Sequence, residues 1–413
     1  MNILEEIQNC PVEWKELGEV CEIVRGNGLQ KKDFVDEGIP CIHYGQIYTY
    51  YSSYVYKTKS FVSISLSEKL KKAQTGDIIV ATTSENIEDV GKSIVWLGDG
   101  DVCIGGHSCI IKTNENPKYI NYYMQSIFFQ KQKEKQVIGT KVIELYPKNL
   151  SKIKIPIPPI EIQEKIVQIL DKMTEYVTEL TSELTSRKKQ YSYYRDKLLS
   201  FEDEVYQVEW KTLGEVARFN YGYTDKAKET GDIRFIRITD IDENGYLKSN
   251  DKKYISLTEE SRNYLVKHGD LLMARTGATY GKTLFIDTAE TSAYASFLIK
   301  ITPSEKLNSR YYWHFSKSEL YWKQANNLVS KAGQPQFNAN SLKNVKIPIP
   351  SLEIQSRIVQ VLDNFDMVCN DLNIGLPKEI ELRQKQYEYF REKLLTFVAE
   401  GEYTDSTVQT RHH

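Results

Sequence analysis

The sequence lacks several features that would place it in a familiar class. No stretch approaches the roughly 20 consecutive apolar residues of a membrane-spanning helix. The start, MNILEEIQNC, lacks the basic and apolar regions of an export signal. The six cysteines are scattered without paired Cys-x-x-Cys spacing, which indicates reduced thiols rather than a disulfide framework or a zinc site. We therefore expect a cytoplasmic protein that binds neither a membrane nor a metal.

Signatures of catalysis are also missing. There is no Walker loop, which excludes an ATP-driven motor in this chain. The segment Asn116-Pro117-Lys118-Tyr119 lacks the second proline of the Asn-Pro-Pro-Tyr motif of amino-methyltransferases, and no Gly-rich cofactor loop precedes it. None of the six histidines accompanies a recognisable nucleophile and acid. The sequence therefore predicts no active site, and the remaining candidate function of the chain is binding.

Charge of one sign is not in excess either. Lys and Arg number 54 against 56 Asp and Glu, a formal net charge of −2. This balance excludes a uniformly basic coat for nucleic acid, but not local basic faces, because a sum hides geometry. What the chain has is tyrosine, 28 residues against 14 Phe and 5 Trp, and its polar tip suits half-exposed contact surfaces. At roughly 150 residues per domain, the length predicts two or three domains.

A long internal repeat organises the chain. Three segments recur 192 or 196 residues later: VEWKELGEV from Val12 as VEWKTLGEV from Val208, IKIPIPPIEIQEKIVQILDKM from Ile153 as VKIPIPSLEIQSRIVQVLDNF from Val345, and RKKQYSYYRDKLLSF from Arg187 as RQKQYEYFREKLLTF from Arg383. A shorter echo relates GDIIVATTS, from Gly76, to GDLLMARTG, from Gly269. Residues 22–75 and 218–268 have almost no sequence similarity, so these interiors are either loops that have drifted apart or different surfaces on one scaffold. The close similarity of the joints favours different surfaces.

The joints predict two long helices. Apolar residues step by three and four from Ile162 to Leu198 and again from Ile354 to Leu394, which is typical of a coiled-coil seam. Two such seams in one chain can cover each other by antiparallel packing. Each helix follows an extended Lys-Ile-Pro-Ile-Pro segment, and a helix from about residue 160 to 199 is on the order of 60 Å long. The second helix carries four extra residues, where Gly375 and Pro377 predict a kink or an interruption.

Between the joints, short strands such as DIIVATT and DLLMART mix with helices predicted near residues 119–136 and 309–327. We therefore expect an α+β fold with two globular variable domains separated by two long antiparallel helices, in a circular, pseudo-twofold repeat. The expected order is a first variable domain, a spacer helix, a second variable domain, a kinked spacer helix and a disordered tail, over residues 1–157, 158–201, 202–349, 350–403 and 404–413.

Candidate binding residues cluster in both variable domains. Arg and Lys pair with phosphates and guanine edges, and Gln and Asn pair with adenine. The candidates of the first domain are Arg25, Lys31, His43, Tyr44, Gln46, Lys57, Lys92 and Lys141. Those of the second domain are Arg218, Tyr221, Tyr223, Lys226, Arg234, Arg237, Arg275, Thr276, Thr279, Tyr280, Lys282, Gln334 and Gln336. Each one alone is as readily a solvated surface group, so the clustering carries more weight than any member.

The chain resembles the specificity subunit of type I restriction–modification systems in the sequence, the order and the duplication of its joints. The resemblance rests on residues 12–20 and 208–216, on both Ile-Pro-Ile-Pro joints, and on residues 187–201 and 383–397. It implies a non-catalytic subunit whose variable domains are target recognition domains, each reading one half of a bipartite, asymmetric sequence in double-stranded DNA. It also implies that the helices act as a ruler and dock two modification subunits.

The resemblance further implies that restriction subunits join the complex and that this chain binds no cofactor. S-adenosylmethionine, Mg and ATP would then lie on the partner subunits. Two alternatives stay open from the residues. One is a single-chain restriction or modification enzyme, which would need an Asn-Pro-Pro-Tyr site or an acidic metal cluster. The other is a coiled-coil scaffold that holds two proteins without binding DNA.

Overall fold

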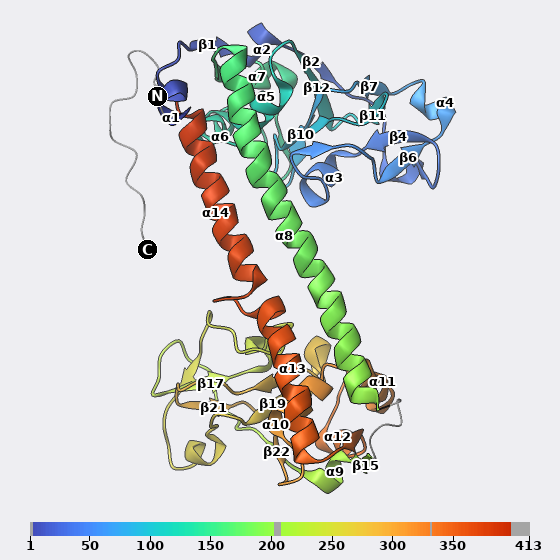
Figure 1. Ribbon diagram of the computed structural model, residues 1–413, viewed down its shortest axis with the longest axis vertical. Helices are drawn as coiled ribbons and strands as arrows, with labels where there is room; N and C mark the ends of the chain where they lie inside the picture. The colour runs from blue at the N-terminus through green and yellow to red at the C-terminus, as the bar shows by residue number, and fades with distance from the viewer. Residues whose placement is uncertain (1–2, 202–207, 331–332, 398–413) are drawn as a thin grey trace. The chain divides into compact units, whose positions relative to one another are not determined.

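A computed structural model describes residues 3–201, 208–330 and 333–397 and divides the chain into two compact units (Figure 1). Unit 1 comprises residues 1–178 and 382–413, and unit 2 comprises residues 179–381. Each unit thus combines one variable domain with a part of each of the two long helical regions. The predicted tail at residues 404–413 lies outside the described residues. In the described ranges, no helix is long and apolar enough to cross a membrane.

The repeated wording at the joints forms the same small sheet in each unit. Strand β1 (Glu13–Glu16) pairs antiparallel with β14 (Lys154–Ile157), with Trp14 opposite Pro156. In unit 2, β15 (Glu209–Thr212) pairs with β23 (Lys346–Ile349) in the same register, with Trp210 opposite Pro348. A two-stranded sheet has only edge strands, and edge strands tolerate proline because one side of each strand needs no N–H donor.

A larger, mainly antiparallel sheet forms the centre of each unit, and its first four strands follow the same order in both units. In unit 1 the order is β2 (Cys21–Arg25), β12 (Ser108–Thr113), β8 (Ile78–Ala81), β10 (Ser93–Trp96) and β5 (Tyr54–Val55). In unit 2 it is β16 (Ala217–Tyr221), β22 (Leu298–Pro303), β19 (Leu271–Ala274) and β20 (Thr283–Phe285). Strands β8 and β19 are buried along their whole length, and alternate residues of each strand point into two different apolar cores. This double burial explains the continuous apolar runs in DIIVATT and DLLMART.

The variable interiors build a second sheet that differs between the units. Unit 1 has five strands, in the order β3 (Phe34–Val35), β6 (Ser60–Val62), β4 (Ile39–Ile42), β11 (Val102–Ile104) and β7 (Lys71–Ala73). Unit 2 has three, in the order β18 (Tyr254–Ile255), β17 (Ile233–Ile236) and β21 (Ser292–Tyr294). The two interiors are therefore different structures on one frame rather than drifted loops, and the predicted α+β class is confirmed.

Each helix predicted between the joints is a pair of shorter helices. Unit 1 has α5 (Pro117–Met124) and α6 (Ile127–Glu134), and unit 2 has α10 (Ser309–Phe315) and α11 (Glu319–Leu328). The two predicted stretches are helical, and each is divided in two because Ser126 and Ser318 cap the second helix of each pair. Their hydroxyls accept hydrogen bonds from the N–H groups of Phe129, at 3.3 Å, and Tyr321, at 3.1 Å.

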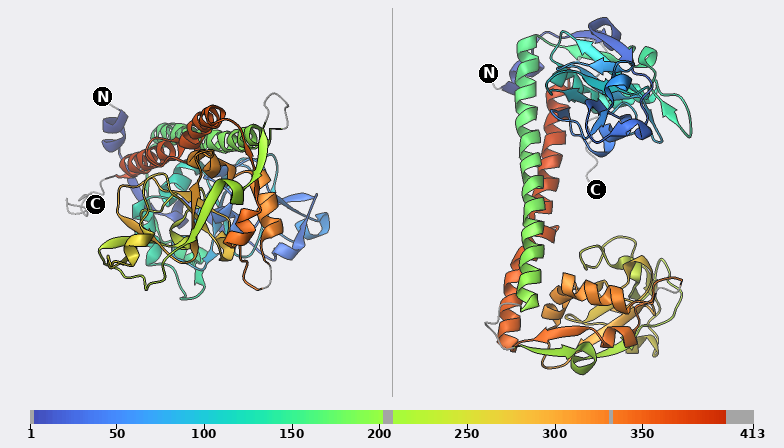
Figure 2. Two further views of the ribbon diagram at one scale, coloured as in Figure 1. Left: turned by 90° about the horizontal axis from the view of Figure 1, so that it is seen from below. Right: turned by 90° about the vertical axis from the view of Figure 1, so that its right-hand side faces the viewer.

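The long helices pack in antiparallel fashion within each unit. Helix α8 (Ile160–Ser200) contributes residues to both units. In unit 1 its Tyr176 ring lies 5.3 Å from the guanidinium of Arg383 on α14 (Leu376–Leu395), while Ile162 nearer its start shares a core with Leu394 (Figures 1 and 2). In unit 2, Tyr194 of α8 stacks on Phe365 of α13 (Leu352–Asn370), with ring centres 5.6 Å apart.

The interruption predicted at Gly375 and Pro377 is present between α13 and α14. The Asp371 carboxylate accepts hydrogen bonds from the N–H groups of Asn373, at 2.6 Å, and Ile374, at 3.2 Å. A Cβ atom on Gly375 would lie 2.5 Å from the carbonyl oxygen of Met367. Only glycine therefore permits this close return of the chain.

Candidate nucleic-acid interface

The backbone hydrogen bonds define which residues of the two units are equivalent. The N–H of Thr82 donates to the carbonyl of His107 at 2.8 Å, and the N–H of Arg275 donates to that of Phe297 at 3.0 Å. In the same way, Ala81 pairs with Lys92 and Ala274 pairs with Lys282, both at 2.9 Å. Thr82 therefore corresponds to Arg275, and His107 corresponds to Phe297. The loops that begin at these positions occupy one place in the frame but carry different side chains.

In unit 2, the side chain of Arg275 is held between two exposed aromatic rings. Its Nε atom donates to the carbonyl of Ser296 at 3.0 Å. Its guanidinium carbon lies 5.3 Å from the centre of the Tyr221 ring and 5.4 Å from that of Phe297. These rings are 46% and 52% exposed, so the cation is oriented at the surface rather than buried. Among the described residues, no hydrogen bond engages its two terminal nitrogens.

The polar loop at residues 333–338 lies against this site. The N–H of Phe337 donates to the carbonyl of Arg275 at 2.8 Å, and Gln336 lies opposite Thr276 in an antiparallel bridge. The Tyr221 hydroxyl accepts a hydrogen bond from the N–H of Ala339 at 3.2 Å. Gln334 and Gln336 are exposed. The structure thus brings together Tyr221, Arg275, Gln334 and Gln336, four of the residues predicted from the sequence, as reading surface 2, with Phe297 as a fifth member.

Unit 1 builds a cationic and aromatic surface at the equivalent place from other positions. Arg25, the counterpart of Tyr221, donates through Nε to the carbonyl of Gly106 at 3.1 Å, and its guanidinium lies 5.5 Å from the centre of the Tyr146 ring. The ring of His107 lies 5.0 Å from that of Tyr44, and its Nδ1 atom is 2.9 Å from the Thr83 hydroxyl. Reading surface 1 therefore consists of Arg25, Tyr44, His107 and Tyr146, with the buried Thr83 hydroxyl holding His107 from below.

Three predicted contact residues are buried, and we correct their assignment. Arg234 is 3% exposed, because its guanidinium bonds to the Glu290 carboxylate at 3.3 Å and to the carbonyl of Lys248 at 2.5 Å. His43 is 7% exposed and accepts the N–H of Gly45 at the start of α3 (Tyr44–Thr49). Burial, with nearby Lys31 and His107, lowers the pKa of His43 to about 4, so this ring is neutral. Thr276 is also buried, and these three side chains support the fold instead of facing DNA.

Two further candidates are already committed to partners inside the protein. Gln46 donates to the Ser60 hydroxyl at 2.7 Å and accepts the N–H of His43 at 3.0 Å. Arg237 donates hydrogen bonds to the carboxylates of Asp240 and Asp251, and the bond to Asp240 is the main reason that the pKa of Arg237 is raised. Residue type alone pointed to these side chains, but their internal partners make them structural.

The remaining candidates lie outside the two reading surfaces. Lys31, Lys57, Lys141, Arg218 and Lys226 are exposed, and no described contact joins them to either surface. Other candidates have local partners: Lys92 pairs with Asp89, Tyr223 packs on Tyr264, and Tyr280 bonds to Asn326, while Thr279 and Lys282 are half-buried in the same loop as Tyr280. Their contact with DNA stays a prediction.

Three residues of these surfaces, namely His107, Phe297 and Tyr146, are not among the candidates predicted from the sequence. In the described ranges, no group of three or more His, Cys, Asp or Glu residues, including any around His107, could hold a metal ion. His107 precedes β12 and Phe297 precedes β22, and the sequences of these two strands are not repeated. Their equivalence follows from the register of the central sheet, which cannot be read from the sequence.

The two halves of the chain match one family model. The model for the type I restriction modification DNA specificity domain matches residues 11–187 and again residues 207–382. A putative type I restriction enzyme specificity subunit of Haemophilus influenzae is 32% identical over 410 residues, which cover 95% of this chain and 97% of that protein. The specificity subunit of the type I restriction enzymes EcoR124I and EcoR124II of Escherichia coli is 34% identical over 304 residues, covering 68% of this chain and 70% of that protein.

Solved structures show the same fold at low identity. The S subunit of a type I restriction–modification system from M. genitalium superposes with a TM-score of 0.58 at 15% identity, covering 95% of this chain and 98% of that one. A chain from a study of complex assembly in the type I system gives the same score at 18% identity, covering 94% and 98%. The duplicated frame, the match of both halves to one model and the relatives above 30% identity lead to one conclusion: this protein belongs to the specificity subunits of type I restriction–modification systems.

Proposed function

We propose that this chain recognises a bipartite, asymmetric sequence in double-stranded DNA, with one half read by each unit. The observation that carries the proposal is the equivalence of the two reading surfaces. Arg275 lies between Tyr221 and Phe297 in unit 2, while Arg25 lies beside Tyr146 in unit 1, on the same backbone frame. Because equivalent positions carry different side chains, the two half-sites differ and the target is not a palindrome.

The long helices set the spacing of the half-sites in this proposal, and they dock two modification subunits. A helix of 41 residues is on the order of 60 Å long at about 1.5 Å per residue. Half-sites one turn of DNA apart lie about 34–36 Å from centre to centre, so such a helix is long enough to act as a ruler. Restriction subunits complete the complex in the cytoplasm. This chain is non-catalytic, and S-adenosylmethionine, Mg and ATP act on the partner subunits.

The proposal is tested by exchanging one variable domain and sequencing the methylome. Residues 1–157 are replaced by the matching segment of a specificity subunit with another target, and the reciprocal exchange of residues 202–349 is the matched control. We expect each exchange to change one half of the methylated motif and to leave the other half and the spacing intact. A change in both halves, or a complex that binds DNA without sequence preference, would refute the proposal. A gel shift with the partner subunits separates it from a scaffold that binds no DNA.

A further inference from the structure

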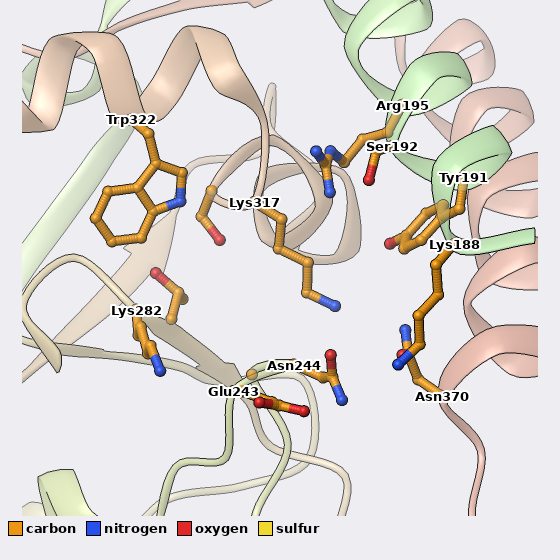
Figure 3. Close-up of a pocket in the computed structure, with 13 residues that line it drawn as sticks. Lys188, Tyr191, Ser192, Arg195, Glu243, Asn244, Lys282, Lys317, Trp322 and Asn370 are labelled. Atoms are coloured by element: carbon orange, nitrogen blue, oxygen red, sulfur yellow. The ribbon is translucent and has the colours of Figure 1, made fainter. Parts of the chain in front are cut away.

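A polar pocket recurs at the equivalent place in both units, next to the long helices. In unit 2 it has a volume of about 250 Å³ and is lined by Lys188 and Arg195 of α8, Lys282, Lys317, Glu243 and Trp322 among others (Figure 3). In unit 1 a pocket of about 390 Å³ is lined by Lys92, Ser93, Gln125 and Arg391 among others. The lysines Lys92 and Lys282 occupy one position in the frame, because both pair with the alanine that ends the central strand.

The two arginines are equivalent as well, and the frame holds them in the same way. Arg195 bonds to the neighbouring Asp196 at 3.2 Å, and Asp196 accepts the N–H of Glu319 at the start of α11. Arg391 bonds to Glu392 at 2.7 Å, and Glu392 accepts the N–H of Ile127 at the start of α6. Each acid therefore ties the long helix to the cap of a short helix and fixes the arginine beside the pocket.

The pocket of unit 2 carries a clear excess of positive charge. Lys188, Arg195 and Lys282 line it against one acid, Glu243, while burial lowers the pKa of Lys317 well below its usual value. Lys317 is paired with Asp366 at 3.2 Å, but no ion pair is made to Lys188 or Lys282 within the described ranges. Figure 3 shows Lys188 and Lys317 extending toward the same central space. An anion in this space would meet unpaired ammonium groups and replace some of the hydration that they lose there.

The pocket of unit 1 is nearly neutral by comparison. Lys92 pairs with Asp89 at 2.6 Å, and Glu88 also lines the space. The position of Lys317 is taken by Gln125, which carries no charge. The difference in charge makes unit 2 the stronger site for an anion, and unit 1 offers a natural comparison on the same backbone.

We propose that the pocket of unit 2 binds a phosphate group and that, given the function proposed above, this is a backbone phosphate of the bound DNA. The loop of residues 275–282 connects the two places, since Arg275 begins it on reading surface 2 and Lys282 ends it in the pocket. The volume of the pocket, about 250 Å³, lies below the roughly 300–1,000 Å³ of pockets for larger organic ligands, which suits a phosphate group. A phosphate held at Lys282 fixes how the loop sits over the bases, because backbone contacts set the register of a protein on the duplex.

The test uses the complex of the full chain with its modification subunits, and fluorescence anisotropy on a target duplex and on a non-target duplex between 50 and 200 mM salt. The variants are Lys282→Ala and Lys188→Ala. The matched control is Lys306→Ala, an exposed lysine beyond Pro303, at the opposite end of β22 from Phe297. Thermal unfolding of each variant verifies that the fold is kept, and Lys188→Glu, at an exposed position of α8 that lines the pocket, provides a second variant if Lys282→Ala unfolds.

We expect each pocket variant to lower the affinity for both duplexes by the same factor and to leave the methylated motif unchanged. Loss of one phosphate contact lowers the slope of log K against log salt by about 0.9, so the loss of affinity is about 3.5-fold larger at 50 mM than at 200 mM. The control keeps the slope of the unaltered chain. Equal slopes for all variants would overturn the pocket assignment while leaving sequence-specific recognition intact.

A second arm distinguishes DNA from free phosphate. Melting curves are recorded in sodium phosphate and in sodium chloride at matched ionic strength, with and without the target duplex. Stabilisation by phosphate that Lys282→Ala abolishes, combined with unchanged DNA slopes, would overturn the assignment to the DNA backbone in favour of a soluble anion. A complex without sequence preference whose slope still falls in Lys282→Ala would instead refute the proposed function and support the pocket.

Discussion

Replacement of Arg275 by alanine tests how unit 2 reads its half-site. The Nε atom of Arg275 is bound to the carbonyl of Ser296, so the two terminal nitrogens remain for a ligand. A guanine presents two acceptors, O6 and N7, in the major groove, and a guanidinium can donate to both. Such a bidentate contact is worth about 1–3 kcal/mol of discrimination, which corresponds to about 5- to 150-fold in affinity. We expect Arg275→Ala to lose discrimination of that size at one base pair of one half-site.

The stacking of Arg275 on Tyr221 and Phe297 does not change this magnitude. These cation–π contacts exist in the free protein, so their loss lowers the stability of unit 2 and largely cancels in the binding equilibrium. Their role is to hold the guanidinium in position before DNA arrives, which lowers the entropic cost of binding. Tyr221→Leu removes this positioning together with the hydrogen bond from Ala339, and we expect a smaller loss than for Arg275→Ala, without a change in the preferred base.

Methylome sequencing is the assay, because it reports the tolerated bases at every position of the motif. Arg275→Ala should relax one position in one half, while Arg25→Ala, the matched change in unit 1, should relax only the other half. Arg275→Lys keeps the charge but loses the planar fork, so it retains affinity for DNA and still loses discrimination. A strict, unchanged motif for Arg275→Ala would refute the assignment of Arg275 as a base reader.

Further predictions concern the buried polar groups of unit 2. Burial raises the pKa of Asp366 to about 7 from 3.8, so the folded state binds its proton more tightly and the contribution of Asp366 to the free energy of unfolding falls between about pH 4 and 7. The Tm of Asp366→Asn minus that of the unaltered chain should therefore grow over this window, and a constant difference would contradict the assignment. Burial lowers the pKa of His314 to about 4 from 6.5, so its contribution rises between these values, and the Tm difference for His314→Gln should show the opposite trend. Gln355 is fully buried and its side chain bonds to the backbone of Asn308, Lys306 and Pro350 at 2.8–2.9 Å. Gln355→Ala should lower the free energy of unfolding in urea by about 2–4 kcal/mol, because it leaves buried backbone groups unpaired, and a loss below about 0.5 kcal/mol would contradict this account.

The frame of the protein could be predicted because its determinants are local in the sequence. The Lys-Ile-Pro-Ile-Pro segments form strands, the apolar seam forms α8, and Gly375 interrupts the second helix where backbone atoms of Met367 approach within 2.5 Å of a Cβ position. Each of these features depends on the conformational limits of residues that lie within one or two turns of one another. The repeat strengthened the prediction, since two independent copies carry the same pattern.

The reading surfaces could be predicted only in part, because burial and pairing depend on residues that are distant in sequence. Arg234 and Arg275 are the same residue type in the same unit, yet Arg234, on β17, is buried and bonds to Glu290, which lies 56 positions away. His107 and Phe297 share a place that becomes visible only when the register of the central sheet is known. A sequence gives the inventory of such groups but not which of them find an internal partner.

The two units also differ in some of their buried side chains. The shared frame can therefore depend only on the buried side chains that both units keep. On the same backbone, unit 1 has Tyr122 where unit 2 has His314, and both side chains bond to the equivalent aspartate of the long helix. Gln163 and Gln355, by contrast, are identical and bond to the same backbone groups in each unit. The frame thus depends on a few buried side chains that satisfy the backbone, which is a requirement independent of which DNA bases are read. Side chains that bond only to other side chains can change while the partner stays the same, and this freedom is what allows one duplicated frame to carry two different reading surfaces.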